Sequence, residues 1–124
     1  MSKVNTMVSA NVEWVQRNQE QIKTHPAWHS DISENESEKL LRDKSPFTYL
    51  LRAGEKEHLY FISFVKENGS IKHQFFALEF DRKGWLYRNG GTTGPQEINS
   101  KDLHQLIPMM MHCDLLACTP LMST

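Results

Sequence analysis

The sequence predicts an α+β fold: a central antiparallel β-sheet of three to four strands flanked by two α-helices, with an extra helix at the N-terminus. Three observations lead to this prediction. Apolar and aromatic residues form strand-like runs in the middle of the chain, an Asn-Gly pair separates two of these runs, and amphipathic helical patterns lie before and after them. The order of helix, strands and helix places the helices on the two faces of the sheet.

The N-terminal segment is polar with scattered apolar residues. Asn11 is a candidate N-cap for a short helix over residues 12–22, in which Trp14 contacts the rest of the protein, and the first ten residues are expected to be disordered. We therefore predict that residues 1–25 form an accessory helix or a partly disordered segment. Residues 26–124 form the main domain.

A second helix and the strands follow. Ser33 and Glu36 form a capping box, which predicts a helix of about ten residues that ends before Pro46. Asn68 and Gly69 predict a hairpin turn between the second and third strands. The predicted strands cover residues 47–53, 59–65, 71–80 and 85–87.

The C-terminal third contains a loop and a helix. Glycine and proline are frequent in residues 89–99, which predicts a loop. Ser100 can cap the following helix, and Pro108 is expected to kink it. The apolar side chains of this helix recur at helical spacing: Leu103, Leu106, Ile107, Met110 and Met111.

The composition excludes several classes of function. The 14 basic and 15 acidic side chains nearly balance, which argues against a broad nucleic-acid or membrane surface. No apolar run is long enough to cross a bilayer, and two cysteines are too few for a disulfide framework. We therefore expect a soluble intracellular protein that neither binds nucleic acid nor inserts into membranes. We also expect a monomer with no cofactor and no metal.

Arg52 is the first candidate for a functional residue. It ends a strand and shares a face with Leu50, where a charge is unfavourable unless an anion pairs with it. The turn at Gly54 can present backbone N–H groups, Lys56 adds a positive charge, and His73 lies on a neighbouring strand. This combination suits a tetrahedral dianion such as phosphate. The alternative is a strand-end arginine that extends into water.

A series of short motifs from Trp28 to Leu121 resembles the Src homology 2 domain. The segment 47–54 resembles the strand motif that contains the phosphotyrosine-binding arginine of that family. The other matching segments are Trp28, the first-helix residues Ile32, Glu38, Leu40 and Leu41, residues 62–64, 71–73 and 84–87, the second-helix residues Leu103, Leu106 and Ile107, and residues 118–121.

The resemblance implies a phosphotyrosine-binding module with no catalytic residues. Its partners would be tyrosine-phosphorylated proteins or peptides. The residues carried over to the phosphotyrosine site are Arg52, Gly54, Glu55, Lys56, His73 and Phe75. Those carried over to the region that reads the peptide sequence are Gly90, Gly91, Thr92, Met109 and Met110.

Several positions depart from the family pattern. Glu34 and Asn35 stand where many members have a second arginine, Gly54 replaces a serine, and Phe75 replaces a basic residue. A carboxylate near the ligand repels phosphate, and flexible methionines favour weak sequence selectivity. Two hypotheses therefore stay open: a phosphotyrosine-binding adaptor or masking protein, and a structural interaction domain of the same fold with a degenerate pocket.

The remaining candidates are weaker. His112, Cys113 and Cys118 offer three metal ligands at most, and Cys113 as a catalytic nucleophile has no oriented imidazole beside it, so a buried structural role is favoured for both cysteines. Because phosphotyrosine signalling is mainly eukaryotic, we expect the protein to act in a eukaryotic cytosol. Synthesis there and delivery into a host by a microbe, as an effector, are both open. The length leaves room for one module and its extra helix.

Overall fold

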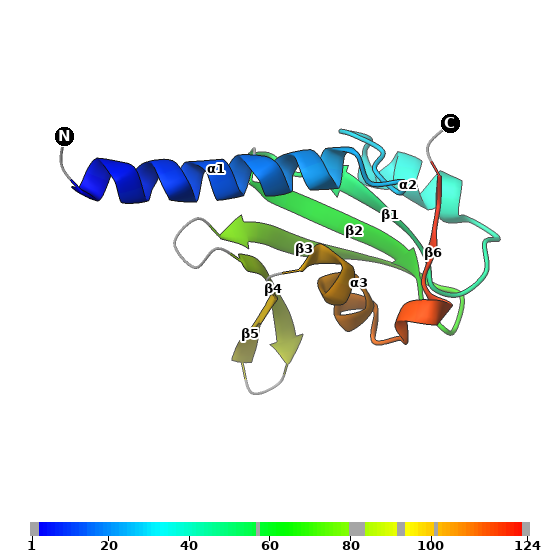
Figure 1. The fold of residues 1–124 in the computed structure, drawn as a ribbon. Coiled ribbons are helices and arrows are strands. Elements are labelled where there is room, and N and C mark those ends of the chain that lie inside the picture. The colour runs from blue at the N-terminus through cyan, green and yellow to red at the C-terminus, as the bar shows by residue number, and fades with distance from the viewer. Residues whose placement is uncertain (1–2, 57, 80–83, 92–93, 101, 123–124) are drawn as a thin grey trace.

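A computed structural model gives the structure of the chain and describes residues 3–56, 58–79, 84–91, 94–100 and 102–122 (Figure 1). Within these residues the elements are α1 (Lys3–Lys23), α2 (Glu34–Leu41), β1 (Thr48–Ala53), β2 (Leu59–Val65), β3 (Ile71–Glu79), β4 (Gly84–Gly91), β5 (Gly94–Ser100), α3 (Leu103–Met111), the short 3-10 helix η1 (Leu115–Ala117) and β6 (Thr119–Pro120).

The strands form one six-stranded sheet in the order β5-β4-β3-β2-β1-β6. Consecutive strands from β1 to β5 pair antiparallel, and β6 pairs parallel to β1. The α+β class is therefore confirmed. The predicted number of three to four strands is too low, because β5 and the two-residue β6 were not expected from the sequence.

The segment 89–99, predicted as a loop, lies mostly in a hairpin. Strands β4 and β5 pair from Trp85↔Ser100 to Gly91↔Gly94, so the loop prediction is wrong for the described residues. The glycines that suggested a loop cluster at the tip of this hairpin. Pro95 is tolerated because β5 is an edge strand, where a backbone N–H is not required on the outer side.

The Asn-Gly pair does connect β2 to β3, as predicted. The N–H of Gly69 donates to the carbonyl of Lys66 at 2.9 Å, and the pair Val65↔Ile71 begins the ladder. Gly69 has φ +89°, a left-handed conformation that glycine adopts without a steric cost. The turn therefore requires a glycine at this position.

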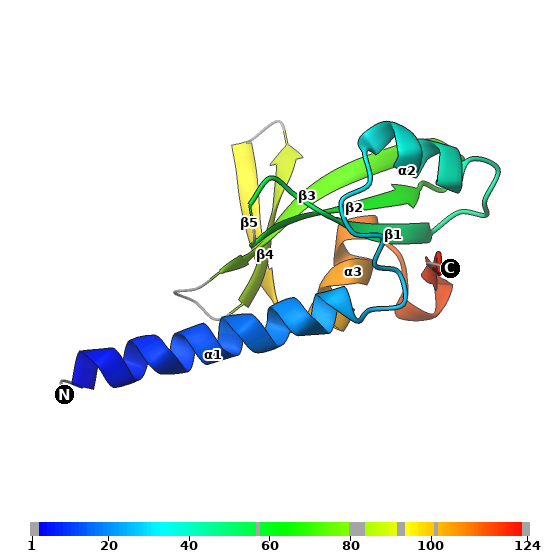
Figure 2. The same ribbon diagram turned by 90° about the horizontal axis from the view of Figure 1, so that it is seen from above.

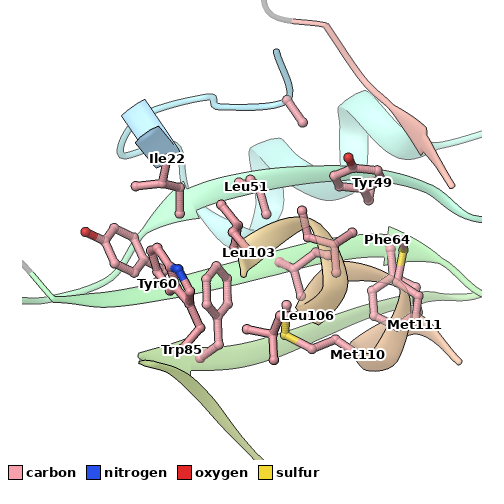
Figure 3. Close-up of a cluster of buried hydrophobic side chains, with 14 of the residues drawn as sticks. Ile22, Tyr49, Leu51, Tyr60, Phe64, Trp85, Leu103, Leu106, Met110 and Met111 are labelled. Atoms are coloured by element: carbon pink, nitrogen blue, oxygen red, sulfur yellow. The ribbon is translucent and has the colours of Figure 1, made fainter. Parts of the chain in front are cut away.

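The two faces of the sheet are covered by different helices. Figure 2 shows α2 on one face and α1 with α3 on the other. Beneath α2, Leu41, Leu50 and Val65 form a small buried cluster. On the opposite face a larger core joins α3 to the rings of Tyr60 and Trp85 (Figure 3). The predicted placement of helices on both faces is confirmed.

Helix α1 is longer than predicted. It begins at Lys3 rather than near residue 12, and residues 3–23 contain no proline or glycine that would interrupt it. Ile22 is fully buried and Trp14 packs against the core, while the N-terminal part extends beyond the sheet (Figure 1). None of the helices described has the length and apolar character needed to cross a lipid bilayer.

The N-cap of α3 is Asp102, not Ser100. The N–H of His104 donates to the Asp102 carboxylate at 2.9 Å, whereas Ser100 is the last residue of β5. Pro108 lies inside the helix without ending it. The carbonyl that loses a partner through Pro108 belongs to His104, an exposed residue, so water can satisfy it.

Candidate functional site

Arg52 is held almost out of solvent at the end of β1. Strand alternation puts Arg52 and Leu50 on the face that carries α2, and Leu50 packs beneath that helix. The arginine is 7% exposed. Burial lowers the pKa of its guanidinium and the nearby Glu34 carboxylate opposes this shift. A guanidinium remains charged at neutral pH, so the site contains a buried positive charge.

Ser63 and His73 fix the orientation of Arg52. The Arg52 Nε–H donates to Ser63 Oγ at 3.1 Å, and Ser63 Oγ lies 2.7 Å from His73 Nδ1. The Nη2 atom of the same guanidinium lies 3.4 Å from His73 Nδ1. Because the other ring nitrogen faces a carboxylate, the arrangement is satisfied when Nε2 carries the proton and Nδ1 accepts. The structure thus brings together Arg52 and His73, as the sequence predicts.

Two carboxylates from α2 surround the outer edge of His73. Its Nε2 lies 3.1 Å from Glu38 Oε1 and 3.4 Å from Glu34 Oε1. The His73 nitrogen and the two carboxylate oxygens lie within 4.8 Å of one another, so they could ligate a divalent cation. In the described part of the chain, nothing beyond this grouping points to an ion. Glu34, expected to repel an anion, does lie beside the site.

An aromatic pair forms another side of the site. The Arg52 Cζ atom lies 4.5 Å from the centre of the Phe61 ring, a cation–π geometry. Phe61 meets Phe75 edge-to-face, with centroids 5.7 Å apart, and Phe75 is 42% exposed. The sequence interpretation missed Phe61 and Ser63. Their two-residue spacing on β2 puts both side chains on one face, but the strand register that brings them to Arg52 and His73 is seen only in the structure.

The turn after Arg52 is closed tightly at Gly54. The Gly54 N–H donates to the carbonyl of Leu59 at 2.8 Å, so this donor is engaged within the protein. A Cβ atom at Gly54 would lie 2.7 Å from the same carbonyl oxygen. Glu55 and Lys56 are exposed in the turn, and Glu57 lies outside the described residues. Glycine is therefore required by the shape of the turn.

We expect Gly54→Ser to destabilise the protein by about 1–3 kcal/mol, because the new Cβ forces the backbone apart. Urea unfolding followed by circular dichroism measures the change. Gly54→Ala is the matched control: it adds the same Cβ without a hydroxyl and should be equally destabilising. A Gly54→Ser protein as stable as the wild type would contradict the tight turn.

The region expected to read the peptide sequence is divided by the structure. Gly90 and Gly91 end β4, and Thr92 lies outside the described residues. Met109 is 40% exposed on α3. Met110 is 1% exposed and belongs to the core, so its assignment to a peptide-contacting surface is corrected: one step along a helix turns a side chain by about 100°, from solvent to the sheet.

Comparison with known proteins adds independent information. The family model of the SH2 (Src homology 2) domain matches residues 28–108, well over half of the chain. The dual specificity protein kinase shkA of Dictyostelium discoideum is 50% identical over 50 residues, which are 39% of this chain and 10% of the kinase. The chain thus spans only a small part of that relative's length. The chain belongs to the SH2 domain family, whose members are binding modules for tyrosine-phosphorylated peptides.

Proposed function

We propose that Arg52 binds the phosphate group of phosphotyrosine in partner proteins. One observation carries the proposal: the buried guanidinium is hydrogen-bonded to Ser63 and His73, and no carboxylate of the described residues, the nearby Glu34 included, lies within ion-pair distance of it. A buried charge without a counter-ion is unfavourable. A phosphate dianion would supply that charge and accept the remaining N–H groups in a bidentate arrangement.

The residues around Arg52 would contribute to ligand binding in different ways. His73, held on both ring nitrogens, would keep Arg52 aligned. Phe61 and Phe75 would contact the phenyl ring of the ligand through their faces and edges. Because the Gly54 N–H is engaged, donors from the turn would come from Glu55 and Lys56, through backbone N–H groups and the Lys56 ammonium.

The depth of Arg52 would select the type of phosphorylated residue. A guanidinium that is 7% exposed is reached by a phosphate on a long, rigid phenyl ring. Phosphoserine carries its phosphate on a single methylene and would not reach it. We expect weak selection among the residues that follow the phosphotyrosine, since Met109 and the glycine-rich end of β4 would line that region with adaptable or absent side chains.

The biological role that fits is that of a monomeric adaptor or masking protein in a eukaryotic cytosol. Residues 26–124 would form the binding module and residues 1–25 an accessory helix, attached by the burial of Ile22. No catalysis is proposed for it.

A panel of three peptides tests the proposal: one sequence with phosphotyrosine, the same sequence with phosphoserine at that position, and the unphosphorylated form. Isothermal titration calorimetry should detect binding of the phosphotyrosine peptide alone. Equal binding of all three, or of none, would support the second candidate, an interaction domain with a degenerate pocket. The carboxylates of Glu34 and Glu38 beside His73 are the observation that favours this second candidate.

We expect Glu34→Gln to raise the affinity for the phosphotyrosine peptide about two- to fivefold at low salt, because it removes a repelling charge that is largely solvent-screened. The Glu34 side chain is 64% exposed, so its effect is modest. Glu36→Gln is the matched control, as Glu36 is exposed on the same helix without a described contact to Arg52 or His73. Unchanged or lower affinity in Glu34→Gln would contradict the repulsion.

A further inference from the structure

The two cysteines lie against each other and pack on the face of the sheet opposite to Arg52. Their Sγ atoms are 2.8 Å apart and both thiols are free. A disulfide places its sulfurs at about 2.05 Å, so closure needs a shift of less than about 1 Å. Cys113 follows α3 and Cys118 precedes β6, which puts the pair at the junction between a helix and the edge of the sheet.

Backbone hydrogen bonds hold this junction. The Cys113 N–H donates to the carbonyl of Pro108 at 3.1 Å. Within the connecting turn, the Ala117 N–H donates to the carbonyl of Asp114 at 2.9 Å, and the Cys118 thiol donates to the same carbonyl at 3.4 Å. The Thr119 N–H then donates to the carbonyl of Phe47, the residue before β1, at 3.0 Å. Hydrogen bonds before, within and after the turn therefore hold the two sulfur atoms close together.

The two thiols differ in their surroundings. Burial, the hydrogen bond with Cys113 and the nearby Asp114 raise the pKa of the Cys118 thiol to about 12. In the reduced protein Cys118 is therefore mostly protonated at neutral pH, and the part of the shift that comes from the Cys113 thiol is absent once Cys113 is in a mixed disulfide. Both cysteines pack against the core and both are partly exposed, so small reagents can reach the pair.

We propose that Cys113 and Cys118 form a dithiol site that exchanges with low-molecular-weight disulfides and closes into an intramolecular disulfide. The Cys113 thiolate attacks one sulfur of the small disulfide and releases the first small thiolate. Cys118 loses its proton to solvent and attacks the Cys113 sulfur of the mixed disulfide, which releases the second small thiolate. The protein dithiol is oxidised by two electrons, and the small disulfide is reduced to two thiols.

Closure would join the end of α3 to β6. Because β6 pairs with β1 at Thr48↔Thr119 and Tyr49↔Pro120, the bond would also secure the edge strand of the sheet. The Arg52 side chain is on the opposite face, with α2. We therefore expect oxidation to raise the melting temperature and to leave phosphotyrosine-peptide affinity unchanged within a factor of about two.

The test uses the full chain, reduced and then incubated with oxidised glutathione, with alkylation of remaining thiols and mass spectrometry. The expected product has lost two hydrogens, carries no glutathione and resists alkylation, and its melting temperature is about 5–10 °C higher. Cys118→Ser should stop at the glutathione adduct on Cys113, and the double serine variant should not react. A wild-type protein that keeps both thiols alkylatable, or that stops at the adduct, would overturn the proposal.

The melting temperature shows whether the disulfide stabilises the protein or whether the two thiols are close by chance. Wild type and the double serine variant should melt at similar temperatures under reducing conditions, and only the wild type should gain on oxidation. A closed disulfide with an unchanged melting temperature would overturn the proposed joining of α3 to β6. None of these outcomes depends on phosphotyrosine binding.

Discussion

Replacing Arg52 with leucine is expected to lower the affinity for a phosphotyrosine peptide by about 100-fold or more, since losing one partner of a desolvated charge pair costs about 3–5 kcal/mol. Leucine retains much of the apolar stem and removes the charge. Ser63 keeps a partner in His73, so the domain should remain folded. Calorimetric titration of the peptide into Arg52→Leu measures the loss, and circular dichroism reports the fold.

Two further variants show whether the loss of affinity is specific to the guanidinium of Arg52. Arg52→Lys keeps a positive charge but not the planar pair of donors, so its affinity should lie between those of wild type and Arg52→Leu. Arg17→Leu, at an exposed position of α1, should bind like the wild type. Wild-type affinity in Arg52→Leu would place the phosphate elsewhere.

Replacing Trp85 with alanine is expected to have the largest effect on stability. Trp85 is fully buried and its ring lies 5.7 Å from that of Tyr60 and 5.8 Å from that of Phe76. Truncating a buried tryptophan costs about 3–5 kcal/mol, a large part of the 5–15 kcal/mol or so that stabilises a typical domain. A fall of the urea midpoint, followed by circular dichroism, measures this.

Trp85→Phe tests the same site with a smaller change. The indole Nε1–H of Trp85 is buried with no hydrogen-bond partner among the described residues. Phenylalanine loses part of the ring but removes this unsatisfied donor, which offsets about 1–3 kcal/mol of the lost packing. We therefore expect Trp85→Phe to be much milder than Trp85→Ala. Equal destabilisation by both would mean that the indole N–H is satisfied.

The parts of the fold that could be predicted depend on local patterns. Ser33 is the N-cap of α2 as predicted, with the Glu36 N–H donating to Ser33 Oγ at 3.1 Å, and the predicted strand 59–65 coincides with β2. Strand β5 was missed because it contains glycine and proline, which are typical of loops. Strand β6 was missed because it has two residues and pairs with β1, which is far away in the sequence.

The candidate site also has a part that could be predicted from the sequence and a part that could not. Arg52 and His73 could be predicted because strand alternation brings them to one face. The contact of Glu38 with His73 depends on how α2 lies over the sheet, and the position of Phe61 depends on the β1–β2 register, Arg52↔Phe61. A single sequence determines neither. The side chains that share one face of a strand could thus be predicted. The side chains that α2 and β2 place beside Arg52 and His73 could not.

The central claim is that phosphotyrosine binds at the buried Arg52. Nuclear magnetic resonance of the labelled protein, titrated with free phosphotyrosine and separately with phosphoserine, tests it most directly. We expect the Arg52 Nε–H and the His73 ring signals to shift and saturate with phosphotyrosine, and to stay in place with phosphoserine. Signals of Arg52 and His73 that do not respond to phosphotyrosine, or that respond equally to both compounds, would contradict it.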